Sequence, residues 1–141
     1  GKDAARVILP ITDPYVVHHG ALGSFATTYL PEGADVADLI ARLSPIEGID
    51  LVVDRDEACR RFELPADRIG DLVLISSENK TLGTSASRHD LSALKEPLRS
   101  HGGLTEQAVP FIVNRVMSDL VEAPELRNFD ALQIAAMAAA S

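Results

Sequence analysis

The order of apolar segments in the first 77 residues constrains the fold of this chain more than any other feature. Three runs rich in β-branched and apolar residues come first, at residues 6–11, 14–20 and 24–30. Thr12, Asp13 and Pro14 come between the first two runs, and the GALG segment at residues 20–23 supplies turn residues before the third. Three strands are therefore expected at the start of the chain, two of them paired as a hairpin.

The pattern changes from a strand period to a helix period between residues 34 and 44. Four apolar residues in this segment are spaced i, i+3, i+4 and i+7, which places them on one face of a helix. They are Val36, Leu39, Ile40 and Leu43. Pro45 follows directly and ends the pattern. The segment is predicted to be an amphipathic helix.

Two further strands are predicted on either side of a short helix. Residues 46–54 form a turn followed by a β-branched run, and residues 71–77 are almost continuously apolar. Between them, Asp54 followed by Glu57 is typical of a capped helix start, and the helix should end near Phe62. Residues 1–77 are therefore expected to form a small, mixed α+β subdomain.

The second half of the chain is not predicted to form another compact α+β subdomain. Residues 78–104 are polar, with one helical turn expected near Leu91–Leu94, and such long irregular segments are uncommon without a function. Residues 109–114 are predicted to be a buried strand and residues 129–140 an Ala-rich helix. No other strand is predicted after residue 77 to pair with that strand. Residues 105–141 are therefore interpreted as the closing strand and helix of a larger α/β sheet.

Composition excludes some classes of partner. The 141 residues include 21 acidic and 13 basic side chains, giving a net charge of −8, which disfavours nucleic acid and anionic membranes as partners. No apolar run reaches the length of a membrane span. Cys59 is the single cysteine, so it cannot form an internal disulfide, as expected of a cytoplasmic protein.

Histidines are the candidate metal ligands. His101 precedes Gly102 and Gly103 in a polar turn, which could be either a ligand loop or an ordinary surface turn. His18 and His19 are adjacent, so on a strand they would point to opposite faces and could not share one metal. His89 is expected to pair with neighbours in a loop. Local sequence alone favours the surface turn for His101.

Residues 78–85 have a composition that could meet a phosphate group. They include Lys80, two threonines, a glycine and a serine. The segment lacks the spacing of a P-loop, and no helix is predicted to follow it. A solvated turn is the simpler interpretation, with Lys80 as a secondary candidate for substrate binding.

Long segments of the chain resemble the C-terminal third of the phosphonoacetate hydrolases, in the alkaline phosphatase superfamily near the nucleotide pyrophosphatases/phosphodiesterases. The resemblance rests on residues 11–31, 60–85 and 88–115. It implies an enzyme with two zinc ions, in which a threonine attacks phosphorus and the carbon–phosphorus bond of phosphonoacetate is cleaved to acetate and phosphate. His101 matches the histidine that serves as a zinc ligand in the family's "HGG" segment.

The resemblance also implies what this chain does not supply. The nucleophilic threonine, the aspartate ligands, the Asp-His pair and the substrate-binding lysines belong to the N-terminal part of such an enzyme. No catalytic residue is therefore expected in this chain, which alone should be inactive and would need that N-terminal part as its partner, within an enzyme that could be a homodimer. Two alternatives stay open: a fragment of a related metal-dependent phosphodiesterase or phosphatase, or a non-catalytic α+β domain that binds a small molecule or a protein.

Overall fold

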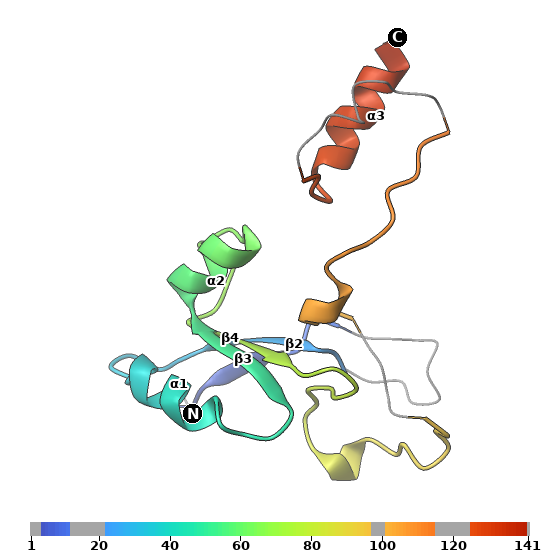
Figure 1. Cartoon of the computed structure of the whole chain (residues 1–141). Coiled ribbons are helices and arrows are strands. Elements are labelled where there is room, and N and C mark those ends of the chain that lie inside the picture. Colours follow the sequence, from blue (N-terminus) through green and yellow to red (C-terminus); the bar gives the residue numbers. More distant parts are fainter. Residues whose placement is uncertain (1–3, 12–21, 97–100, 115–124, 141) are drawn as a thin grey trace. The chain divides into compact units, whose positions relative to one another are not determined.

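A computed structural model describes residues 4–11, 22–96, 101–114 and 125–140 of the chain (Figure 1). The chain divides into two compact units, Gly1–Ala108 and Val109–Ser141. The first contains a sheet with two helices, which confirms the mixed α+β class expected from the sequence. The division into residues 1–77, 78–104 and 105–141 stays a prediction.

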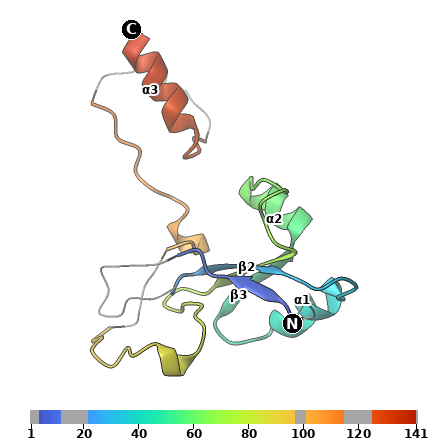
Figure 2. The same cartoon turned by 180° about the vertical axis from the view of Figure 1, so that it is seen from behind.

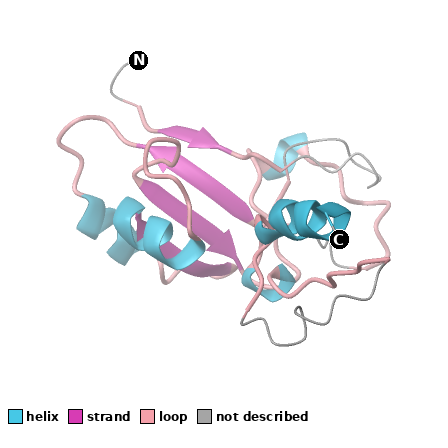
Figure 3. Cartoon of the chain, turned by 90° about the horizontal axis from the view of Figure 1, so that it is seen from above, coloured by secondary structure: helices cyan, strands magenta, loops and turns pink. Residues whose placement is uncertain are grey.

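Within its described residues, the first unit has a sheet of four strands in the order β1-β2-β4-β3. They are β1 (Arg6–Ile8), β2 (Phe25–Tyr29), β3 (Ile49–Asp54) and β4 (Leu72–Ser76). All three neighbouring pairs are antiparallel, and Figure 3 shows the strands as magenta arrows. The four described strands lie where the sequence predicts them. The strand expected at residues 14–20, with His18 and His19, falls outside the described residues.

Helix α1 (Val36–Leu43) confirms the amphipathic pattern. The Asp35 side chain caps it by accepting the backbone N–H of Asp38 at 2.9 Å. Leu39 and Leu43 line an open apolar groove together with Leu72 and Leu74 of β4. The helix therefore lies on the face of the sheet to which the even-numbered residues of β4 point.

Helix α2 (Arg55–Phe62) covers the opposite face of the sheet, as the views in Figures 1 and 2 show. The predicted cap is present, since Asp54 accepts the N–H of Glu57 at 2.8 Å. The buried cluster on this face consists of Val53, Ala58, Ile69, Val73 and Ile75. It is the main core of the unit.

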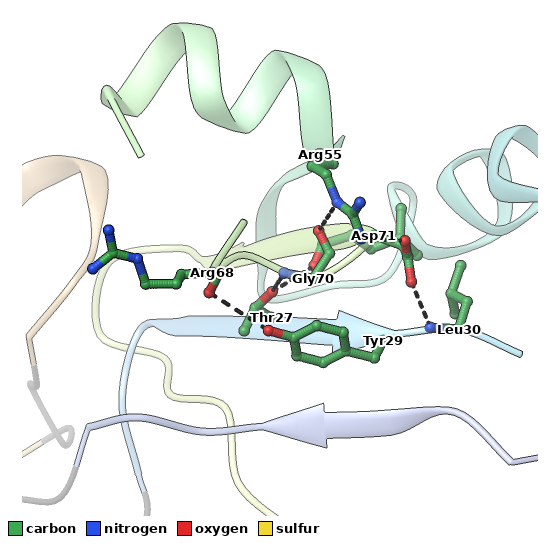
Figure 4. A network of polar contacts seen from close by, with 8 residues as sticks. Thr27, Tyr29, Leu30, Arg55, Arg68, Gly70 and Asp71 are labelled. Carbon is green, nitrogen blue, oxygen red and sulfur yellow. Dashed lines mark hydrogen bonds and ion pairs between the residues drawn. The ribbon is translucent and has the colours of Figure 1, made fainter. Parts of the chain in front are cut away.

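Polar contacts fix the loop between α2 and β4 to strand β2 (Figure 4). Asp71 accepts the N–H of Leu30 at 2.8 Å and binds the Arg55 guanidinium at 2.7 Å. The Thr27 hydroxyl accepts the N–H of Gly70 at 2.8 Å. A side chain at position 70 would lie within 2.6 Å of this oxygen or of the Thr28 carbonyl, so only glycine fits there.

The long polar segment is less irregular than the sequence suggested. A 3-10 turn, η1 (Ala86–Arg88), precedes the turn at Leu91–Leu94, where one backbone hydrogen bond of 3.0 Å closes. Leu82 exchanges two backbone hydrogen bonds with Gly23. The segment is thus fixed to the residues that lead into β2.

The second unit differs from its prediction at one element. Helix α3 (Asp130–Ala140) is present as expected, but residues 109–114 do not form a strand. A strand requires a neighbour with which to exchange backbone hydrogen bonds, and the described part of this unit offers none. Val109 and Ile112 are 69% and 87% exposed. Within this unit, the segment and α3 line an open apolar cavity of about 530 Å³.

No helix in the described ranges is both long and apolar enough to cross a membrane.

Candidate functional site

His101 begins a short loop, residues 101–103, which we call the HGG loop. Its carbonyl oxygen accepts the backbone N–H of Ser24 at 2.9 Å, directly before β2. The His101 side chain is exposed. The loop backbone is therefore fixed to the sheet, while the imidazole remains accessible to a ligand.

The two glycines of the loop are required by packing within this chain. Gly102 has a φ of 86°, which disfavours any residue with a Cβ, and a Cβ there would lie 3.0 Å from that of Phe25. Gly103 is buried, and a Cβ there would lie 3.3 Å from that of Ser24. In a ligand loop, glycines at these positions would also let the backbone pass close to a metal. In the structure, close passage beside β2 and the residue before it is a sufficient reason.

The loop continues into η2 (Leu104–Glu106), a single 3-10 turn that sequence reasoning did not predict. Glu106 accepts the backbone N–H of Gly103 at 2.7 Å through Oε2. Leu104 packs against the core cluster under α2. The sequence did contain one signal for this turn. Glu106 follows Gly103 by three residues, and a glutamate at this spacing from the residue that precedes a helical turn is typical of a capping box.

Lys80 lies at the end of a turn that follows β4. Its N–H donates to the Ser77 carbonyl at 3.1 Å, and its own carbonyl accepts the Ser76 hydroxyl at 2.8 Å. The ammonium lies 3.8 Å from a carboxylate oxygen of Glu47, and both side chains are largely exposed. Such a pair contributes little to stability and leaves the lysine available to other anions.

A shallow polar depression lies between the Lys80 turn and the residues that follow His101. It is lined by Ser24, Ser76, Ser77, Glu78, Asn79, Lys80, Gly103, Thr105 and Glu106. Ser24 connects its two sides, because its N–H donates to His101 and its carbonyl accepts the N–H of Ser76 at 2.9 Å. Ser24 is therefore hydrogen-bonded both to His101 and to Ser76, which lies just before the turn that contains Lys80. A single residue thus brings the segments of the two candidate residues together.

His89 has a structural role in its loop. Its Nε2 accepts the backbone N–H of Thr84 at 3.2 Å, so this nitrogen is occupied within the loop. Thr84 lies five residues before His89 in the same loop. His18 and His19 lie outside the described residues.

The described residues contain no group of three or more metal-ligating side chains. A catalytic zinc takes about three protein ligands and keeps one position open. Among the described residues, His101 is therefore not part of a complete zinc site.

Comparison with solved structures identifies close relatives. A crystal structure of phosphonoacetate hydrolase from Sinorhizobium meliloti 1021, in complex with phosphonoacetate, is 74% identical to the chain and superposes with a TM-score of 0.77. This chain is similar to one third of a phosphonoacetate hydrolase. The match covers 97% of the chain and 33% of the relative, and the complex of that enzyme with phosphonoformate gives a TM-score of 0.76.

A shorter match comes from a curated protein. Phosphonoacetate hydrolase of Penicillium oxalicum is 58% identical over 31 residues, which are 21% of this chain and 43% of that protein. No family model matches the chain. The resemblance inferred from the sequence is confirmed, and the chain spans well under two thirds of the length of each of these relatives.

Proposed function

We propose that this chain acts as part of a zinc-dependent phosphonoacetate hydrolase, which uses water to cleave the carbon–phosphorus bond of phosphonoacetate and releases acetate and phosphate. The observation that supports this proposal is the 74% identity to the Sinorhizobium meliloti enzyme across 97% of the chain. The chain corresponds to 33% of that enzyme, so the rest of the catalytic machinery would come from the remaining two thirds. The chain alone would be inactive.

His101 would be the contribution of this chain to the metal centre. Its exposed imidazole lies on a loop whose backbone is fixed at the His101 carbonyl and at Gly103. Zinc, when bound, would stabilise the negative charge that develops on the phosphoryl oxygens. The other ligands would come from the remaining two thirds of the enzyme.

Lys80 would have the lesser role of attracting the anionic substrate. It lies at the rim of the polar depression that Gly103 and Glu106 also line, and its ammonium is exposed. An exposed lysine raises the local concentration of anions and accelerates their association. We place it at the mouth of the site rather than against the reacting atoms.

The second unit would complete the core of the larger protein. Its extended segment exposes Val109 and Ile112, and α3 exposes Leu132 at 82%. The extended segment and α3 also line an open apolar cavity, and exposed apolar patches usually mark an interface. This supports the interpretation of residues 105–141 as a strand and helix of a larger sheet.

The same enzyme would act in the cytoplasm. Cys59 is half-buried and unpaired, which suits a reducing compartment.

The experiment is to measure phosphate release from phosphonoacetate by the enzyme that contains both this chain and the remaining two thirds, at saturating zinc. His101→Ala should lower kcat/KM by at least about 100-fold while the far-UV circular dichroism is unchanged, because a lost ligand opens the metal site but not the fold. The matched control is His89→Ala, which removes a loop histidine and should retain most activity. Near-normal turnover of His101→Ala would overturn the assignment.

A further inference from the structure

The Glu106 carboxylate holds two donors directly behind the HGG loop. Oε2 accepts the backbone N–H of Gly103 at 2.7 Å, and Oε1 accepts the Thr105 hydroxyl at 3.1 Å. Gly103 is buried, and Glu106 is half-buried. Hydrogen bonds to an ionised carboxylate are shorter and stronger than neutral ones. Glu106 therefore fixes the backbone two residues after His101.

The backbone of the HGG loop is also fixed at its first two residues. The His101 carbonyl accepts the Ser24 N–H at 2.9 Å, and Gly102 lies close to Phe25. Leu104, one residue after the loop, packs against the core cluster. The peptide groups that follow His101 and Gly102 are thus both held, which restricts where the backbone places the imidazole. A metal site needs such restraint, because ligand distances must be met within about 0.2 Å.

We propose that Glu106 is a positioning residue for His101, and that it acts as a hydrogen-bond acceptor for the loop backbone rather than through its charge. This inference rests on the proposed function, in which His101 binds zinc. Outer-shell carboxylates commonly orient a histidine through its second ring nitrogen. Here the orientation is transmitted through the peptide backbone, from the Gly103 amide to the His101 imidazole.

Two conservative variants in the complete enzyme separate the two possible roles. Glu106→Gln keeps an acceptor oxygen at the same reach and removes the charge, while Glu106→Asp keeps the charge and shortens the side chain so that it no longer reaches Gly103. Zinc affinity is measured by competition with a chelator, and kcat and KM for phosphonoacetate are measured alongside. Glu106→Asp should weaken zinc binding by about 10- to 100-fold and lower kcat more than it raises KM. Glu106→Gln should stay within about threefold of the parent, because a neutral acceptor retains roughly half the bond strength.

Amide hydrogen exchange at Gly103 supplies a readout that does not depend on metal or activity. Exchange should accelerate in Glu106→Asp and remain slow in Glu106→Gln. The control is Glu32→Ala, which removes an exposed glutamate from the turn before α1 and should change none of these quantities.

The His101→Ala variant separates failure of this inference from failure of the proposed function. If it binds zinc as tightly as the parent, then His101 is not a ligand and both proposals fall. If it loses zinc while Glu106→Asp retains the parent's affinity, the positioning role alone is wrong. Loss of zinc in Glu106→Gln with retention in Glu106→Asp would assign Glu106 an electrostatic role and overturn the inference as stated.

Discussion

The two faces of the sheet are covered by helices of equal length, but the helices pack against them very differently. On the α2 face, Ala58 and Val73 are fully buried and Ile75 is 2% exposed. On the α1 face the helix has no buried residue, and beside it lies an open apolar groove of about 290 Å³. Yet α1 has the clearer apolar stripe in the sequence. An apolar stripe therefore indicates which side of a helix faces the sheet, but not how tightly the helix packs.

Polar contacts account for part of the difference. Arg55, the first residue of α2, binds Asp71, and Asp71 also accepts the N–H of Leu30. The helix is thus joined at its start to both β2 and β4. The side-chain bonds of α1, from Asp35 to Asp38 and from Ser44 to Ile40, stay within the helix and its caps.

The largest effect is expected from truncating neighbouring residues of β4 that point to opposite faces. Ile75→Ala should reduce the free energy of unfolding by about 2–5 kcal/mol, since the surrounding cluster cannot collapse around the cavity. Leu74→Ala, on the half-buried α1 side, should cost about half as much because the open groove already admits solvent. Global opening energies from amide exchange of β4 in the complete protein measure both. Equal costs for the two variants would mean that the faces are equally well packed.

A smaller effect is expected from breaking the connection between α2 and the sheet. Asp71→Ala removes the partner of both Arg55 and the Leu30 N–H, and should cost about 1–3 kcal/mol. Asp67→Ala is the matched control, because Asp67 and its partner Arg68 are each about three-quarters exposed and their pair should matter by less than about 0.5 kcal/mol. Chemical denaturation of the complete protein gives the comparison. A neutral Asp71→Ala would show that the helix is held by its apolar contacts alone.

The smallest effects are expected at the two helix caps, which have nearly the same geometry. Asp54 and Asp35 each accept the backbone N–H three residues on, at 2.8 and 2.9 Å. Alanine at either position should cost its helix about 1 kcal/mol. In Asp54→Ala we expect the loss to lower global stability, because α2 covers the core. In Asp35→Ala it should accelerate amide exchange within α1 only, and a loss of global stability there would contradict the loose packing of α1.

Local signals in the sequence predicted the helices and the described strands well. Asp54 with Glu57 gave the start of α2, and Pro45 marked the end of α1 to within two residues. The order β1-β2-β4-β3 was beyond such signals, because it depends on contacts between distant residues such as Thr27 and Val73. Residues 109–114 have strand-like composition, but a strand also needs a partner, and the sequence predicted none after residue 77.

The candidate site was predictable in its parts but not in its assembly. Local sequence singled out His101 and Lys80 but ranked a surface turn above a ligand loop. The roles of Ser24 and Glu106 were missed for different reasons. Glu106 had a local signal in its spacing from Gly103, while Ser24 acts only through bonds to residues more than 50 positions away.

Because the Ser24 N–H donates a hydrogen bond to the His101 carbonyl, the position of the histidine depends on how β2 is aligned in the sheet. Ser24 lies one residue before β2, so a slip of β2 by one residue would displace the histidine by about 3.4 Å, more than ten times the tolerance of a metal–ligand distance. Residues inserted between positions 84 and 96 would lengthen a mostly exposed loop and leave the alignment of β2 unchanged. In the proposed enzyme, an insertion within β2 would instead shift the imidazole away from the other metal ligands, even in a chain that still folds.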